Sequence, residues 1–221
     1  VRLKEELERL ALPLVLINLP AGDLMQGGDG LACVPARQAD FDQALQEALS
    51  YAAMTRPQAV NVLAGRLPAG VAREDALATL AANLRTTAEA FQLLGIRVYC
   101  EAINPLDMPG FLANTPEDLL GLLDAVAHPN LFAQLDLYHM ARQGLDLPAA
   151  IRELAGRIGH VQFADCPGRG APGSGALDFA AALQALRENG YDGWLAAEYR
   201  PDAAGTEAGL DWLADWRAKP L

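Results

Sequence analysis

Four consecutive apolar runs each have, at or near their end, a side chain whose oxygen atom could bind a metal ion. These side chains are Glu101, Asp136, Gln162 and Glu198. Burying an unpaired carboxylate is costly, so several carboxylates that converge imply a bound cation or shared protons. A set made only of oxygen atoms favours a hard ion, Mg²⁺ or Mn²⁺, over zinc, which prefers His and Cys. The sequence therefore predicts a divalent metal site. The alternative for any one of these residues is a capping or hydrogen-bonded polar group at a strand end.

Two histidines lie close to this set in the sequence. His139 follows Asp136 by three residues and is predicted to reach the same cavity, unless loop backbone satisfies its ring. His160 precedes Gln162 by two residues, so on a strand it shares the face of that residue. For His160 a functional role behind the ligands and an ordinary core histidine are both open.

Two loops are predicted to wall the site. The Gly/Pro-rich residues 165–175 carry one cation, Arg169, and a guanidinium recognises a carboxylate through two hydrogen bonds. The alternative is a solvated loop arginine. Residues 104–111 follow Glu101, and their Asn104 and Asp107 are predicted to contact substrate from the opposite side.

Six short apolar runs are candidate strands, over residues 12–18, 59–64, 96–102, 131–137, 158–164 and 193–199. Several are continuous rather than alternating, which predicts parallel strands covered by helices on both faces. Helical periodicity appears between them over residues 73–94, 115–126 and 179–189, with Thr115 and Pro116 typical of a helix start and Gly190 of a helix end. This alternation predicts a parallel α/β fold of the TIM-barrel type, in which the ends of all strands meet on one catalytic face.

The length fits one domain but not a complete barrel. A closed (β/α)₈ barrel has eight strands and usually about 250 residues, whereas this chain has 221 residues and six apolar runs. Residues 2–10 form a predicted amphipathic helix that leads into the first run. We therefore expect a single barrel domain over residues 1–221, truncated ahead of Val1 by two strands and a helix, or a barrel that is incomplete. Exposed sheet edges would then favour a homo-oligomer.

Charge and composition exclude several partners. The formal net charge of −11 repels nucleic acid and anionic lipid, and no run approaches the roughly 18 apolar residues of a membrane span. The three cysteines lie far apart without a CxxC pair, as in proteins of the reducing cytosol. The charged N-terminal segment is not a signal peptide. These features predict a cytoplasmic protein with a small-molecule partner.

The sequence resembles the hydroxypyruvate isomerase family over essentially its whole length. The resemblance rests on residues 18–23 (NLPAGD), 101–104 (EAIN), 107–111 (DMPGF), 134–140 (QLDLYHM), 159–165 (GHVQFAD), the PGR and PGSG of the following loop, and 193–199 (GWLAAEY). It implies a xylose-isomerase-like barrel whose first two strands would precede Val1.

The resemblance also implies roles for individual residues. In the wider superfamily two glutamates bind the metal and move protons, and here they correspond to Glu101 and Glu198, with Asp136 as a further ligand. Many ketose 3-epimerases have His where this chain has Gln162, a departure that fits the hydroxypyruvate isomerase group. His139 and Arg169 resemble positions that contact substrate. The implied reaction interconverts hydroxypyruvate and tartronate semialdehyde through an enediol.

Other readings use the same residues differently. A 2-oxo-tetronate isomerase or a ketose 3-epimerase would share the fold and differ in substrate. An apurinic-site endonuclease is disfavoured, because a multi-metal nuclease site needs many His ligands and a basic cleft, and this chain has three His and a charge of −11. A catalytically silent sugar-acid binding protein would bind metal without turnover.

Overall fold

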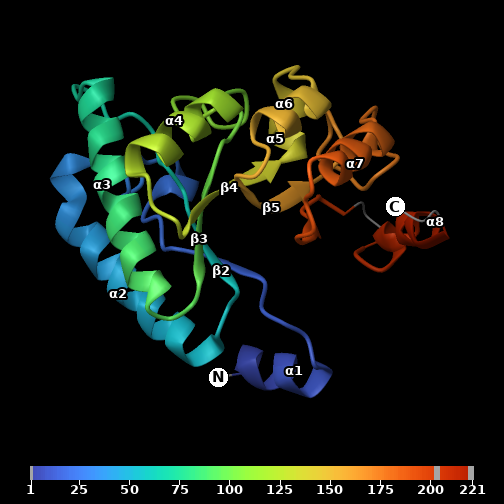
Figure 1. The fold of residues 1–221 in the computed structure, drawn as a ribbon, viewed down its shortest axis with the longest axis horizontal. Helices are drawn as coiled ribbons and strands as arrows, with labels where there is room; N and C mark the ends of the chain where they lie inside the picture. The colour runs from blue at the N-terminus through green and yellow to red at the C-terminus, as the bar shows by residue number, and fades with distance from the viewer. Residues whose placement is uncertain (1, 202–204, 219–221) are drawn as a thin grey trace.

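The computed structural model describes residues 2–201 and 205–218, and its centre is one parallel sheet of six strands in the order of the sequence. The strands are β1 Leu16–Asn18, β2 Ala59–Val62, β3 Arg97–Glu101, β4 Leu131–Asp136, β5 Ile158–Phe163 and β6 Leu195–Ala197. Each pairs in parallel with its neighbours along the chain, so β1 and β6 are the edges of the sheet and β2 to β5 lie between them (Figure 1). This arrangement confirms the predicted barrel-type fold with six βα units.

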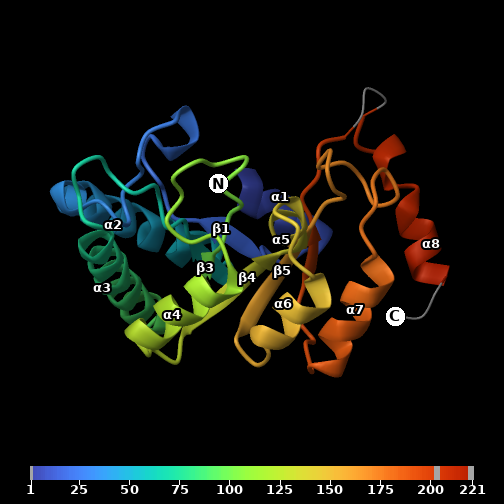
Figure 2. The ribbon, with the colours of Figure 1, turned by 90° about the horizontal axis from the view of Figure 1, so that it is seen from above.

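Eight α-helices accompany the strands within the described residues. They are α1 Arg2–Leu10, α2 Gln38–Thr55, α3 Arg73–Gln92, α4 Pro116–Val126, α5 Leu137–Arg142, α6 Leu147–Glu153, α7 Phe179–Glu188 and α8 Trp212–Ala218. Three short 3₁₀ turns lie at Leu24–Gln26, Pro35–Arg37 and Ala208–Leu210. Helices α2, α3, α4, α6 and α7 follow one another around the outer side of the sheet (Figure 2). Helix α1 has no buried residue, and no described helix is long and apolar enough to cross a membrane.

Local signals place the predicted elements to within a few residues. The helix expected at Thr115 begins with a capping box, in which the Thr115 hydroxyl accepts from the Asp118 amide and the Asp118 carboxylate accepts from the Thr115 amide. Gly190 follows α7 with a positive φ of 73°, as a glycine that ends a helix does. The first strand is shorter than the predicted 12–18, although the carbonyls of residues 14 and 15 still accept from the backbone amides of Gln58 and of Ala59, the first residue of β2.

The prediction of helices on both faces was wrong, because the sheet curls. Tyr99 on β3 stacks on His160 on β5, with ring centroids 6.0 Å apart and planes within 7°, although β4 lies between the two strands. The inner face is thus concave, and polar side chains alternate with the apolar ones that pack under the helices. On β3, for example, Val98 and Cys100 belong to the hydrophobic core, whereas Glu101 lies on the inner face. The hollow side of the sheet is therefore lined with groups that can do chemistry.

Candidate active site

The predicted ligands meet where the strands end. Glu101 is the last residue of β3 and Asp136 the last of β4, Gln162 stands one residue before the end of β5, and Glu198 follows β6 directly. The sheet register pairs Glu101 with Gln134 and Asp136 with Gln162. Glu101, Gln162 and Glu198 line one pocket of about 340 Å³, which is large enough for a small metabolite.

Asp136 joins the strand to a helix and presents one oxygen to the site. Its Oδ1 caps α5 by accepting from the backbone amide of Tyr138 at 2.8 Å. Its Oδ2 is buried and makes no hydrogen bond. His139 Nε2 lies 3.6 Å from this oxygen, and Arg169 Nη2 lies 3.8 Å from it. Burial, and then the charge of Glu198, raise the pKa of Asp136. An unsatisfied buried carboxylate oxygen is what a cation site requires.

Glu101 is held by side-chain amides. Its Oε2 accepts from Asn61 Nδ2 at 3.1 Å and from Gln134 Nε2 at 2.9 Å. Its Oε1 lies 4.0 Å from His139 Nε2. Burial raises the pKa of Glu101 well above the ordinary value, and the charges of Asp136 and Glu198 raise it further. The amides therefore fix the orientation of this carboxylate and leave Oε1 directed into the site.

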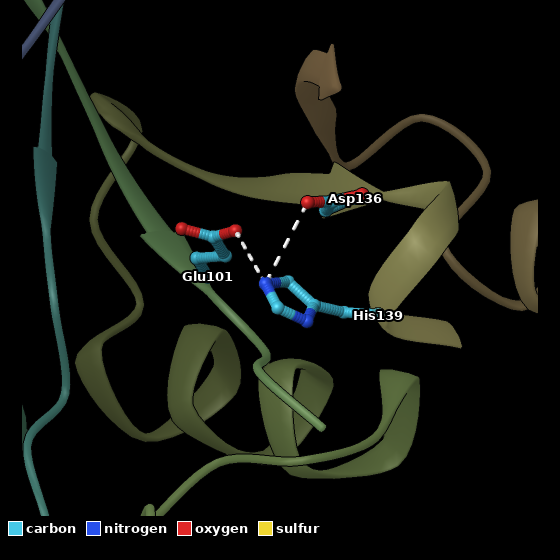
Figure 3. A group of neighbouring side chains, drawn as sticks. All are labelled: Glu101, Asp136 and His139. Carbon is cyan, nitrogen blue, oxygen red and sulfur yellow. Dashed lines mark ion pairs between the residues drawn. The ribbon is translucent and has the colours of Figure 1, made fainter. Parts of the chain in front are cut away.

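Glu101, Asp136 and His139 form a buried cluster (Figure 3), in which one ligand atom from each residue lies within 4.8 Å of the others. Two carboxylates with raised pKa values and an orphaned oxygen fit a divalent cation. Burial lowers the pKa of His139 to about 4, and the charge of Arg169 lowers it too, so its ring is neutral at physiological pH. The cluster can thus hold a metal ion.

An amide network that the sequence analysis missed connects this cluster to Gln162. Gln134 Nε2 donates to Gln162 Oε1 at 2.6 Å as well as to Glu101, and Asn61 Nδ2 also donates to Asn18 Oδ1 at 3.2 Å. Gln134 precedes Asp136 by two residues on β4, so the two-residue period of a strand was the signal that places it on the same face. The network thus links Gln162 to Glu101 through Gln134, which donates to the side-chain oxygens of both residues.

Glu198 and Arg169 form the open side of the site. The Glu198 side chain is half exposed, and its Oε2 lies 3.1 Å from Arg169 Nη2. The Arg169 guanidinium also lies over the Tyr138 ring at 5.1 Å. Its loop is tied down by Asp165, whose carboxylate accepts from the backbone amides of residues 166, 173 and 177. Arg169 is thus brought into the site, as expected, and Asp165 organises the loop.

Of the three remaining predicted site residues, one lines the pocket and two do not. Asp107 lines the pocket, whereas Asn104 is fully buried behind it and contacts His139 Nδ1 at 2.7 Å. His160 does not line this pocket; it lies deeper on the concave face, with Nε2 unpartnered and a pKa that burial lowers to about 4. Two arginines that the sequence analysis did not select, Arg66 and Arg200, also line the pocket.

Comparisons with known proteins identify the family of the chain. A profile of the xylose isomerase-like TIM barrel family matches residues 1–216. The chain is 38% identical to hydroxypyruvate isomerase of Escherichia coli strain K12, covering 97% of this chain and 83% of that protein. It is also 38% identical to 2-oxo-tetronate isomerase of Cupriavidus necator, covering 96% and 81%.

Solved structures share the architecture. A Brucella melitensis protein described as an AP endonuclease of family 2 superposes with a TM-score of 0.90 at 33% identity, covering 97% of this chain and 82% of that one. An L-ribulose 3-epimerase superposes with a TM-score of 0.77 at 28% identity, covering 98% and 71%.

The chain belongs to the xylose isomerase-like TIM barrel family and, within it, to the hydroxypyruvate isomerase family. It is an enzyme of the aldose–ketose isomerase type.

Proposed function

We propose that this enzyme interconverts hydroxypyruvate and tartronate semialdehyde by proton transfer through an enediolate. The observation that carries the proposal is the placement of Glu101 and Glu198, from strands β3 and β6, in the lining of one pocket at the ends of the strands. Two carboxylates that face a bound substrate from different strands can remove a proton from one carbon and return one to its neighbour.

Glu101, Asp136, Gln162 and Glu198 would hold Mg²⁺ or Mn²⁺. When bound, the cation supplies positive charge against the negative charge that develops on the two adjacent oxygens of the substrate. The fit rests on the unsatisfied Oδ2 of Asp136 and on a donor set made of oxygen.

Proton transfer falls to the two glutamates. One takes the proton from the hydroxymethyl carbon of hydroxypyruvate, and the other delivers a proton to the former carbonyl carbon. The hydroxyl proton of the hydroxymethyl group moves to the former carbonyl oxygen, which leaves an aldehyde on one carbon and a hydroxyl group on the other. Burial raises the pKa of Glu101, so this carboxyl group accepts a proton more readily than an exposed glutamate does. Each such group contributes about 10² to 10⁴ in rate.

The substrate class follows from the cations of the pocket. The protein carries a net charge of −11, yet Arg66, Arg169 and Arg200 all line this pocket. Arg66 is committed to three backbone carbonyls, those of residues 24, 28 and 109. Arg169 and Arg200 are therefore the better candidates for the substrate carboxylate, which a neutral ketose lacks. His139 and Asp107 also line the pocket and would contact the substrate through their polar atoms.

A 2-oxo-tetronate is the second candidate substrate, because a relative of equal identity carries that name. It differs from hydroxypyruvate by one hydroxymethylene unit, and the open Glu198 side of the pocket is where the extra unit would fit. The name of the Brucella relative raises an endonuclease as a third reading. The acidic charge of this chain opposes it, and we propose that neither nucleic acid nor membrane is a partner. A cytoplasmic location and self-association through the edges of β1 and β6 stay predictions.

The test is a turnover assay with hydroxypyruvate, a 2-oxo-tetronate and a ketose in the presence of Mg²⁺ or Mn²⁺. We expect turnover of hydroxypyruvate by the parent protein and a loss of roughly 10² or more in kcat for Glu101→Gln and for Glu198→Gln. Glu89→Gln, on the exposed side of α3, is the matched control and should retain parental activity.

Three results would each reject a different part of the proposal. Preference for the tetronate or the ketose would replace the substrate, and cleavage of abasic DNA would replace the class. Metal binding without turnover of any substrate would identify a silent binding protein.

A further inference from the structure

The side-chain amide of Asn104 has only one chemically acceptable orientation. Its Oδ1 accepts from the backbone amide of Asp107 at 2.8 Å, and its Nδ2 donates to Asp107 Oδ2 at 3.2 Å. Rotating the amide by 180° would set two oxygens against each other and two N–H groups against each other. The backbone and side chain of Asp107 therefore fix which atom of Asn104 is the nitrogen.

Asp107 is itself held as an acceptor. Burial would raise its pKa, but the Tyr138 hydroxyl, which donates at 2.7 Å, the amide of Asn104 and the charge of Arg142 hold the pKa below the ordinary value. A carboxylate that accepts all these donors has no proton to offer Asn104. The orientation of Asn104 is thus fixed by an ionised partner.

This orientation determines where His139 carries its proton. The second N–H of Asn104 Nδ2 points to His139 Nδ1 at 2.7 Å, and both groups are buried. A nitrogen that accepts from Asn104 cannot carry a proton, so this contact requires a neutral ring whose one proton is on Nε2. Nε2 is the atom that faces Asp136 Oδ2 at 3.6 Å and Glu101 Oε1 at 4.0 Å (Figure 3).

We propose that Asn104 is a positioning residue that keeps His139 in the Nε2–H tautomer. A protonated Nε2 has no lone pair for a cation, so His139 stays outside the metal ligand set although it lies within the cluster. Instead it donates a hydrogen bond to a substrate oxygen in the pocket. This inference rests on the proposed function for the substrate, but the tautomer is a property of the free protein.

The test reads the tautomer directly by long-range ¹H–¹⁵N NMR of the imidazole rings. The chain has only three histidines, so His128→Gln and His160→Gln assign the spectrum. We expect a bare Nδ1 and a protonated Nε2 at His139, without metal and after addition of Mg²⁺. Asn104→Asp places an acceptor opposite Nδ1 and should move the proton to that nitrogen, with a loss of about 10- to 100-fold in kcat for hydroxypyruvate and a smaller change in KM.

Tyr138→Phe is the matched control, because it removes one donor to Asp107 but leaves the contacts between Asp107 and Asn104 in place; its His139 tautomer should match the parent. A proton on Nδ1 in the parent overturns the proposal, as does loss of the Nε2 proton when Mg²⁺ binds. If Asn104→Asp does not fold, the parent spectrum alone decides. Absence of hydroxypyruvate turnover would reject the proposed function and leave the tautomer assignment untouched.

Discussion

Carboxylate side chains at the centre of the sheet and at its edge differ in their burial and in the partners that stabilise them. At the centre, Glu101 and Asp136 are 5% and 1% exposed. At the edge, the side chain of Glu198 is 51% exposed. The central carboxylates depend on amide and backbone donors, because water does not reach them, whereas Glu198 is solvated and paired with Arg169.

The difference teaches how the work of the site is divided. The centre is preorganised, since amides from both neighbouring strands hold Glu101 and the first turn of α5 holds Asp136. These two buried carboxyl groups are placed to receive a cation. The edge has one neighbouring strand and a loop, so Glu198 and Arg169 can adjust to a substrate. We therefore expect metal affinity to depend on the centre, and substrate range on the edge.

Metal removal should produce the largest effect. Chelation is expected to reduce isomerase activity to background, and Mg²⁺ or Mn²⁺ to restore it. A cation at about 100 times its Kd should stabilise the folded protein by about 2.7 kcal/mol. Asp136→Asn should abolish this stabilisation and Glu198→Gln should only reduce it, as measured by thermal unfolding with and without metal. Equal losses at the two positions would remove the distinction between centre and edge.

The pH dependence of the metal-free protein should be the next largest effect. Because the pKa values of Glu101 and Asp136 are raised in the fold, the folded protein keeps protons that the unfolded chain has released. Each group therefore lowers the free energy of unfolding by up to about 1.4 kcal/mol per pH unit, from about pH 4, where the unfolded carboxyl loses its proton, up to its pKa in the fold, which is about 7 for Asp136. Above about pH 6.5 the histidines no longer offset this effect, so the net free energy of unfolding should fall as the pH rises, until both carboxyls are ionised. Below about pH 6.5 the lowered pKa values of His139 and His160 have the opposite effect on the free energy of unfolding. The histidines of the unfolded chain bind protons there, whereas the buried rings of the folded protein stay neutral, so this contribution to stability falls as the pH falls.

Urea unfolding in the presence of a chelator, across this range, checks the slope. Glu101→Gln should flatten the alkaline side most. Glu198→Gln should flatten it less, because it removes only a neighbouring charge. A metal-free protein that becomes more stable as the pH rises above about 6.5 would contradict the buried-charge account.

Two asparagines of the amide network offer the smallest and most local comparison. Asn61→Ala removes a donor to buried Glu101 and should cost about 1 to 3 kcal/mol of stability. Asn18→Ala, at the exposed end of β1, should stay within about 0.5 kcal/mol of the parent. Chemical unfolding of both variants at one pH measures the pair, and a larger loss at Asn18 would contradict the ranking.

Much of the fold could be predicted from the sequence, because its signals are local. Apolar runs bounded by turns indicate strands, and Thr115 with Asp118 or Gly190 indicates helix ends through contacts within a few residues. The convergence of Glu101, Asp136, Gln162 and Glu198 was also predictable, since parallel strands present their C-terminal ends on one face.

The degree to which the sheet curls, and the contacts that the curl creates, were not predictable in the same way. Whether a face is covered by helices or curves into a hollow depends on the twist summed over all strands, which no single run contains. The curl decides that Tyr99 reaches His160 across β4, and that Gln134 and Asn61 support Glu101 from two neighbouring strands.

What the sequence by itself determined is therefore the order of the elements and the residues that stand at the strand ends, because these depend on short-range periodicity and turn chemistry. Only the tertiary structure decided how these residues divide their roles. It buried Asn104 behind His139, brought Arg169 from its loop onto Glu198, and left Glu198 in solvent while it enclosed Glu101. Each of these contacts joins segments that are distant in the chain, so its energy depends on distances that only the folded backbone sets.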